Sequence, residues 1–379
     1  MCEDCGSTPL TDTSEQAGFS RRRLLGATGA AVASAGLVAA TGCSAAAPTA
    51  GPAPRRDQSR PPLELVLLGT FSGPPVDPYR KGTASALVVD GSTYVVDCGR
   101  SSVTQYVEAG LRLDSLRSIF ITHLHADHVA DYYNFIMLGA LPNMSGDAIR
   151  TIDVYGPGRA GGLPPKFGGG QAGTVNPTNP TPGITDLTNS CTDAFAYSTN
   201  VFLRDSGIRD PRRITTIHDI VVPEVGASYQ NTAPDMAPFV VMQDDKVKVT
   251  ALLVPHGPVF PAFAYRFDTA YGSVTFSGDT AYSTAVPRLA ANTDILVHEA
   301  ESFEGYQGPP ALADHLRKSH TEVQRVGEIA HAANAGQLVL THIADLTHNP
   351  IPVPQWWRWV QQGYGRRVTV GGDLQRITV

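Results

Sequence analysis

The amino-acid sequence predicts an α/β protein built as a four-layer αββα sandwich, in which two mixed sheets pack together and helices cover their outer faces. Two observations support this fold class. From residue 63 onward, short apolar runs alternate with turn signals and with helical patterns. These strands and helices also fall into two similar halves, although no sequence repeat relates them. A chain of 379 residues that is 42% hydrophobic can bury a large core.

The first half begins with an apolar run that is typical of a strand. The expected elements, in chain order, are a strand over 63–70, a hairpin over 84–99, a helix over 101–111, a strand over 118–125, a helix over 129–141 and a strand over 150–157. Asp90-Gly91 is the turn pair of the hairpin because it separates two β-branched runs. The helix over 129–141 is apolar nearly all round, which indicates a buried position.

Residues 157–235 interrupt this rhythm. The stretch GRAGGLPPKFGGGQAGTVNPTNPTPG has almost no apolar periodicity and predicts a long surface loop. A helical segment is expected after it, over 184–205. We interpret the whole stretch as a cap inserted over one face of the domain.

The second half resumes the alternation after the cap. Its expected elements are a strand over 247–257, a hairpin over 262–280, a strand over 294–300, a helix over 321–336, a strand over 337–343, a helix over 353–365 and strands over 366–372 and 374–379. The pair Tyr271-Gly272 marks the hairpin turn. Thr321 is the expected cap of the helix over 321–336.

The N-terminal 61 residues have the composition of an export signal and a linker. SRRRLL at 20–25 places paired arginines before a weakly apolar run, which is typical of a twin-arginine signal over residues 1–43. Cys43 closes that run in AATGC, a sequence similar to a lipoprotein cleavage site, so lipidation of Cys43 is left open. Residues 44–61 read as an Ala/Pro-rich linker. The domain is therefore expected over 62–379, exported to the periplasm or the cell-envelope exterior. If Cys43 is lipidated, that anchor is the sole expected link to the membrane.

The charge of the expected mature domain argues against a long polyanionic substrate. Removing residues 1–61 takes away six of the 29 Lys and Arg and five of the 35 Asp and Glu, which leaves 23 basic and 30 acidic side chains. Proteins that hold nucleic acid usually have the opposite balance, because phosphate contacts supply much of their affinity. On this ground we do not expect tRNA as the partner, whereas formation of a homo-oligomer stays open.

The stretch IFITHLHADHVAD, 119–131, holds an unusual group of potential metal ligands. His123 and His125 are two residues apart on an extended segment, so both can point the same way. Asp127 and His128 follow at the turn into a helix. So short a loop cannot readily place all four on one ion, whereas two ions could share them in pairs. Surface histidines beside a helix-capping aspartate are the alternative, which the clustering makes improbable.

A site for two ions requires further ligands at other strand ends. Three candidates each follow an apolar strand: His256 in LLVPHG, Asp279 in TFSGDT and His342 in VLTHI. Taken singly, each is more often a polar loop residue. Together they predict one more histidine for each ion and a carboxylate that bridges the two.

These motifs resemble the metallo-β-lactamase superfamily, whose HxHxDH signature is similar to THLHADH. The resemblance covers about residues 63–379. It implies an αββα sandwich with two zinc ions per chain. Its ligand set is His123, His125 and His256 on the first ion, Asp127, His128 and His342 on the second, and Asp279 between them. The lactamases themselves lack a bridging Asp at this position, so antibiotic hydrolysis is not expected.

A narrower resemblance is to ribonuclease Z and the related arylsulfatases and phosphodiesterases, carried by VVDCG, FSGDT, VHEAESF, SHTEV and VLTHI. That branch implies a proton donor, His320, oriented by Glu299, whereas a capping histidine and a surface carboxylate are the alternatives. Asp97 in VVDCG is a candidate to orient a ligand histidine, or else a turn residue. This chain departs from ribonuclease Z because only 22 residues, forming a plain hairpin, join His256 to Asp279, where that enzyme carries a basic arm for tRNA.

The function expected from these features is an exported hydrolase with two zinc ions that cleaves phosphodiester or sulfate ester bonds of small molecules. A hydroxide held between the two ions would attack phosphorus or sulfur. Asp127 would accept its hydrogen bond, and His320 with Glu299 would protonate the leaving oxygen. One alternative is a ribonuclease Z-type endonuclease that processes tRNA 3′ ends. The other is a zinc-binding lipoprotein without enzymatic activity, against which a proton donor argues.

Overall fold

The computed structural model describes residues 61–141, 148–166 and 168–379. The expected export signal and nearly all of the linker, including Arg21, Arg22 and Cys43, lie outside the described residues. Among the described residues, the search for a helix of sufficient length and apolar character to cross a membrane found none.

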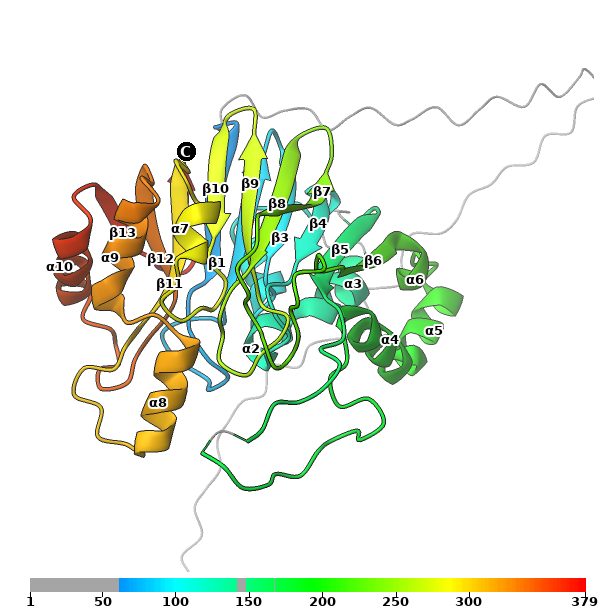
Figure 1. Cartoon of the computed structure of the whole chain (residues 1–379). Coiled ribbons are helices and arrows are strands. Elements are labelled where there is room, and N and C mark those ends of the chain that lie inside the picture. The colour runs from blue at the N-terminus through cyan, green and yellow to red at the C-terminus, as the bar shows by residue number, and fades with distance from the viewer. Residues whose placement is uncertain (1–60, 142–147, 167) are drawn as a thin grey trace, which may run out of the picture. The chain divides into compact units, whose positions relative to one another are not determined.

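Two mixed seven-stranded sheets form the framework (Figure 1). The first sheet has the order β14-β1-β2-β3-β4-β5-β6, and the second has the order β13-β12-β11-β10-β9-β8-β7. The strands of the first sheet are β1 (Leu63–Gly69), β2 (Ala84–Val89), β3 (Ser92–Val96), β4 (Leu116–Phe120), β5 (Ile152–Pro157), β6 (Thr215–Ile220) and β14 (Arg376–Thr378). Those of the second are β7 (Phe239–Gln243), β8 (Val247–Leu253), β9 (Phe263–Thr269), β10 (Gly272–Phe276), β11 (Ile295–Ser302), β12 (Gln337–Asp345) and β13 (Arg367–Val370).

The helices are short, and most lie against the outer faces of the sheets. They are α1 (Ser102–Glu108), α2 (Ala126–Val129), α3 (Tyr132–Gly139), α4 (Ile184–Ala194), α5 (Ala196–Asp205), α6 (Pro211–Ile214), α7 (Ala285–Leu289), α8 (Pro310–Ser319), α9 (Val323–Ala332) and α10 (Val353–Gly363), with a 3-10 turn at Leu113–Ser115. In Figure 1, α2, α8 and the loop before α4 all lie at the lower end of the sheets, which is the end that carries the candidate site. The four-layer αββα sandwich predicted from the sequence is confirmed.

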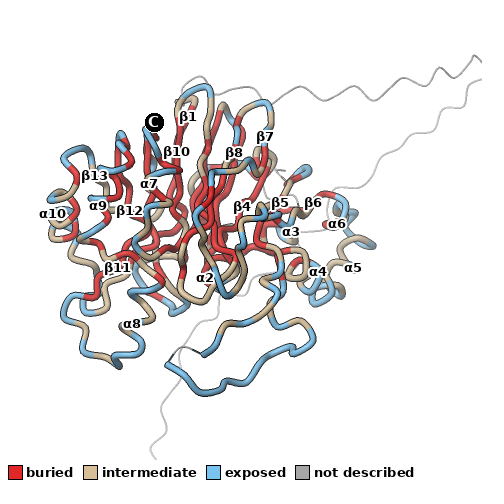
Figure 2. Tube along the Cα trace, in the orientation of Figure 1, coloured by how far each residue is buried: buried red, intermediate tan, exposed pale blue. Residues whose placement is uncertain are grey.

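The core explains why the strands are apolar on both faces. Leu65 and Leu67 of β1 point into the cluster between the sheets, whereas Val66 and Leu68 point into a second cluster against α1 and α3. This alternation follows from the two-residue period of a strand. In Figure 2 the strands are largely buried, whereas α8 and the loop before α4 are largely exposed.

The stretch 157–235 differs from the expected cap in one respect. Its residues Thr215–Ile220 form β6, which pairs in parallel with β5 at the edge of the first sheet. This strand therefore belongs to the sheet and not to a cap, whereas the cap interpretation of the loop and of α4–α6 stays a prediction. The sequence did not predict this strand because TTIHDI mixes polar and apolar residues. Such a mixture is possible because an edge strand is only half-buried.

Further elements were absent from the sequence expectation, among them α7, β7 and α8. Strand β7 pairs with β8 in antiparallel fashion, and α8 precedes the helix predicted over 321–336. That helix begins at Val323 without a side-chain cap, so Thr321 does not cap it. The Thr321 hydroxyl instead donates to the carbonyl of Thr280. The predicted helix over 129–141 is observed as α3, which begins at Tyr132, and the turn before it, Ala126–Val129, forms the separate α2.

Candidate metal centre

The segment after β4 presents the four clustered ligands. His123 is fully buried and His125 is exposed, both before α2, while Asp127 and His128 are buried in its single turn. Asp97 lies beside them at the end of β3. Its Oδ2 is 2.9 Å from Nδ1 of His128, and its Oδ1 accepts from the backbone N–H of Thr122 at 2.8 Å. The candidate role of Asp97 thus has a geometric basis, because a carboxylate on one ring nitrogen fixes the orientation of the other.

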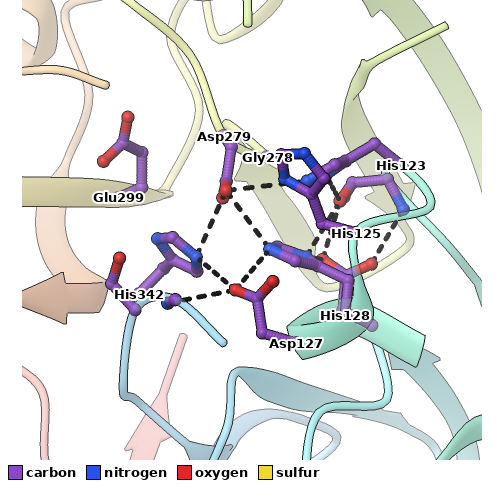
Figure 3. A network of polar contacts seen from close by, with 12 residues as sticks. His123, His125, Asp127, His128, Gly278, Asp279, Glu299 and His342 are labelled. Carbon is purple, nitrogen blue, oxygen red and sulfur yellow. Dashed lines mark hydrogen bonds and ion pairs between the residues drawn. The ribbon is translucent and has the colours of Figure 1, made fainter. Parts of the chain in front are cut away.

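Asp279 lies at the centre of the cluster (Figure 3). Its Oδ2 is 3.2 Å from Nε2 of His128 and 3.2 Å from Nε2 of His342. The same oxygen is 3.7 Å from Nε2 of His123 and 3.8 Å from Nε2 of His256. The carboxylate therefore lies within reach of both histidine groups, which is where a bridging ligand would have to be.

The turn before Asp279 depends on glycine. Gly278 has φ 57°, and a Cβ there would lie 2.4 Å from the carbonyl oxygen of Phe263. A side chain would therefore collide with the backbone of β9 as well as strain the left-handed conformation. The sharp turn after β10 places the carboxylate at the end of the sheet.

His342 reaches the cluster through a β-bulge. Glu299 of β11 pairs with Thr341, and Ala300 pairs with Ile343, so His342 is the extra residue of β12. It has a positive φ of 44°, which is uncommon for a side chain of this size. The bulge turns the ring toward Asp127, whose Oδ2 is 3.3 Å from Nε2 of His342.

The donor set fits divalent cations. Buried side-chain atoms without a hydrogen-bond partner include Nε2 of His123, Nε2 of His128, Oδ1 of Asp127 and Oδ1 of Asp279. Within the described chain, three groups of ligand atoms lie close enough to hold an ion: His123, His125, His256 and Asp279; Asp127, His128 and His342; and Asp279, His320 and His342. Unpaired nitrogen and carboxylate oxygen atoms gathered in this way are the donors that zinc prefers.

The ionisable groups of the cluster shift one another's pKa. Burial opposes ionisation of Asp279, but the neighbouring His342, His128 and His123 hold its pKa well below the usual range. Burial also lowers the pKa of His123 and of His256, with crowding by other histidines adding to the effect. These two rings are therefore neutral, which is the form in which a histidine binds a metal.

The proton donor expected from the sequence, His320, lies beside the cluster at the C-terminal end of α8. Its Nδ1 is 3.5 Å from Oε1 of Glu299 and 3.7 Å from Oε1 of Glu301. Burial opposes its protonation, but the two carboxylates outweigh burial and raise the pKa of His320 to about 10. The ring is therefore a cation that could give up a proton.

The Glu299 carboxylate is held in place by the backbone. Its Oε1 accepts from the N–H of Thr321 at 2.9 Å and from that of Thr280 at 3.2 Å.

The His320 ring stacks on that of His342, with centroids 5.6 Å apart. Because His320, His342 and Asp279 also form a ligand group, the geometry alone allows His320 to be either a ligand or an acid.

Glu301 was missed by the sequence reasoning. It is buried, and its Oε1 accepts from the hydroxyl of Ser72. The signal was available, since Glu299 and Glu301 are two apart on one strand and share a face.

His298, to which the sequence gave no role, is buried and contacts the carbonyl of Glu299 through Nδ1 at 2.6 Å. It does not belong to any metal-binding group among the described residues.

A cavity of about 680 Å³ opens onto the cluster. Asp127, Asp279, His320 and His342 line its inner end, and the segment 71–75 and α8 line its walls. This volume is typical of small-molecule sites.

The sequence and fold comparisons agree with this geometry. The family model described as "Anti-Pycsar protein Apyc1" matches residues 63–136. The chain is similar to ribonuclease Z of Mycobacterium bovis, with 26% identity over 318 residues that cover 84% of this chain and 98% of that protein. It is equally similar to ribonuclease Z of Mycolicibacterium gilvum, with 26% identity over 321 residues covering 84% and 96% of the two chains.

Solved structures show the same fold. Human tRNase Z, short form, has a TM-score of 0.56 at 20% identity, covering 83% of this chain and 99% of that chain. The metallo-β-lactamase fold protein YhfI from Bacillus subtilis has a TM-score of 0.53 at 16% identity, with coverage of 83% and 99%. The chain has the metallo-β-lactamase fold and is homologous to ribonuclease Z. With its histidine and aspartate cluster, it is a metal-dependent hydrolase of ester bonds.

Proposed function

We propose that the protein is a phosphodiesterase of the ribonuclease Z type that binds two zinc ions and cleaves a phosphodiester bond in RNA. The observation that carries the proposal is the alignment with ribonuclease Z along 84% of the chain, combined with the gathering of the six other expected ligands around Asp279. This homology weakens the expectation, drawn from charge, that tRNA is not the substrate. It favours the ribonuclease Z alternative over the small-molecule interpretation.

The residues that would hold the ions are those predicted from the sequence. His123, His125 and His256 would take the first ion, Asp127, His128 and His342 the second, and Asp279 would contact both. When bound, the ions would activate water near neutral pH and neutralise negative charge on the phosphate oxygens.

The chain's own groups would position the proton transfers. Asp127 keeps Oδ1 unpaired while its Oδ2 accepts from the N–H of Gly73 at 3.0 Å, so one oxygen is free to accept a hydrogen bond inside the cavity. His320 would donate a proton to the leaving oxygen, and Glu299 would orient the ring. General acid catalysis of this kind contributes roughly 10²- to 10⁴-fold.

A small phosphodiester is the second candidate substrate, and two observations favour it. The cavity of about 680 Å³ has Asp77, Glu301 and Asp345 in its walls, and Arg80 is the one Lys or Arg among the described residues that line it. Arg80 itself donates to the Thr70 hydroxyl and the Gly371 carbonyl. The residues between His256 and Asp279 form the hairpin of β9 and β10 with no basic arm. Both features suit a compact substrate better than a long polyanion.

The test is a substrate panel on zinc-loaded protein: a precursor tRNA with a 3′ trailer, bis(4-nitrophenyl) phosphate and 4-nitrophenyl sulfate. We expect release of the trailer, with a strong decrease in rate as salt rises. Hydrolysis of the phosphodiester without trailer release would support the small-molecule candidate. Hydrolysis of the sulfate alone would contradict both candidates, and binding of zinc without any turnover would support the non-enzymatic alternative.

We further propose that the protein is exported through its twin-arginine sequence at 20–25. The support is the order of residues, with paired arginines before a weakly apolar run and an Ala/Pro-rich stretch after it. Changing both Arg21 and Arg22 to Lys should leave the precursor in the cytoplasm. Unchanged export of that double variant in a fractionation experiment would contradict the proposal.

A further inference from the structure

A second cavity, of about 360 Å³, adjoins the cluster on another side of His125. We call it the proline cavity. Six prolines line it, from the segment before α4 and the loop after His256: Pro157, Pro164, Pro180, Pro182, Pro258 and Pro261. The exposed His125 lines both this cavity and the large cavity that contains Asp127, Asp279 and His320. The two spaces therefore meet at a ring that belongs to the candidate metal centre.

The two cavities differ in chemistry. The large cavity contains charged walls, including Arg80, Asp77 and Asp345. In the proline cavity, by contrast, His125 and Thr181 are the lining residues with polar side chains, and the remainder are apolar or glycine. Prolines keep φ fixed, so such walls lose little entropy when a ligand binds. The proline cavity suits a neutral, flat group and does not suit a phosphate.

The geometry of phosphodiester cleavage indicates which part of the substrate would occupy each cavity. A phosphodiester carries two substituents on one phosphorus, and only one of them leaves. His320 lines the large cavity and not the proline cavity, so the leaving oxygen must face the large cavity to receive the proton. The other substituent then has to extend away from His320, and His125, which lines both cavities, leads to the proline cavity.

We propose that the proline cavity is a specificity site that binds the ring of the substituent retained on phosphorus, namely a nucleobase or a similar uncharged planar ring. This inference rests on the proposed phosphodiesterase function. It assigns a role to the loop before α4, whose composition the sequence analysis noted without explaining. Leu163 and Ala160 on this loop would contact the ring.

Binding is measured first, because it does not depend on turnover. The zinc-loaded full chain is titrated by calorimetry with adenosine monophosphate and with methyl phosphate, which share the phosphate but not the base. Burial of a base should give the nucleotide an advantage of about tenfold in Kd. Leu163→Glu, at a side chain that is 54% exposed, places a charge on the cavity wall and should abolish that advantage. Ala160→Glu, on the same wall, should act in the same way.

Matched control variants test whether the nucleotide's advantage in Kd depends on the proline cavity. Val175→Glu makes the same change of charge in the same loop, at a residue that is 89% exposed and does not line the cavity, and it should keep the advantage. Leu312→Glu changes the wall of the large cavity and should also keep it. Loss of the advantage in Leu312→Glu but not in Leu163→Glu would place the base in the large cavity and overturn the inference.

Turnover then separates this inference from the proposed function. Bis(4-nitrophenyl) phosphate and methyl 4-nitrophenyl phosphate share a leaving group and differ in the retained substituent. Their kcat/KM ratio should fall about tenfold in Leu163→Glu relative to the wild type and stay constant in Val175→Glu. An unchanged ratio with both esters hydrolysed would overturn the specificity site and leave the hydrolase standing. Base-dependent binding without hydrolysis of any ester would overturn the hydrolase and leave the site standing.

Discussion

The two halves of the sandwich supply the candidate metal centre in different ways. In the first half, His123, His125, Asp127 and His128 lie within six residues of one loop. In the second half, His256 follows β8, Asp279 follows β10 and His342 lies in a bulge of β12. The first group is positioned by local backbone conformation, whereas the second is positioned by the pairing of strands distant in sequence.

The halves also differ in how their histidines are oriented. Nδ1 of His128 faces the carboxylate of Asp97, a side chain. Nδ1 of His256 donates instead to the carbonyl oxygen of Ser319 at 2.8 Å, a backbone group. A single side-chain substitution can therefore remove the group that orients His128 in the first half. In the second half, the group that orients His256 is part of the backbone, so only a change of backbone position would remove it. The predictions below test this contrast, in order of decreasing effect.

Asp279→Ala should have the largest effect, because its carboxylate contacts histidines from both halves. We expect loss of about two zinc ions per chain and at least 10³-fold lower activity. His123→Ala should also lose metal and activity. Metal analysis of purified protein is the measurement, with Asp193→Ala, an exposed aspartate on α4, as the control. Full zinc content in Asp279→Ala would show that the halves bind metal independently.

His320→Ala should keep the metal but lower turnover by roughly 10²- to 10⁴-fold for substrates with poor leaving groups. The loss should be small for 4-nitrophenolate, which leaves without protonation. Glu299→Gln should show the same pattern more weakly. The measurement is turnover against leaving-group pKa, together with zinc content. A constant loss across all leaving groups, or missing metal, would make His320 a ligand of the second half.

Asp97→Asn should weaken metal binding by about 10- to 100-fold without unfolding the protein, because the amide keeps the shape but not the charge beside His128. Competition with a chelator gives the affinity, and thermal unfolding checks the fold. Ser319→Ala is the matched change in the second half. It should have little effect, since the carbonyl that faces His256 is retained. Equal losses in the two variants would remove the distinction between the halves.

Glu301→Gln should cause the smallest change, a displacement of the alkaline limb of the pH–rate profile. The carboxylates of Glu301 and Glu299 raise the pKa of His320, so removing one of them lowers that pKa. The acid form is then lost at a lower pH, and the limb moves to lower pH for substrates with poor leaving groups. The 4-nitrophenyl esters serve as the internal control because their limb should not move. A shift to higher pH would contradict the assignment.

The same contrast explains how much the sequence could predict. The cluster at 123–128 was visible because its ligands are neighbours in the chain. His256, Asp279 and His342 could be proposed because each follows an apolar strand. The bulge that turns His342 could not be foreseen, since it depends on how β11 and β12 pair. Glu301 was missed although it lies two residues after Glu299 on the same strand, whereas its contact with Ser72, 229 residues away, could not be foreseen. Strand β6 was missed because edge strands carry a weak apolar pattern.

The pairing of β14 with β1 has a consequence for how the chain folds. The strand that precedes β14, β13, belongs to the second sheet, so the last strand returns to the first sheet and pairs beside its first strand. The pairing joins Glu64 to Thr378, which lie at opposite ends of the domain sequence. During synthesis, the edge of β1 stays unpaired until β14 has been synthesised. Contacts of such separation slow folding, and an open edge favours association between chains. The nascent chain should therefore depend on chaperones, and fusions that bury residues 376–378 should yield aggregates.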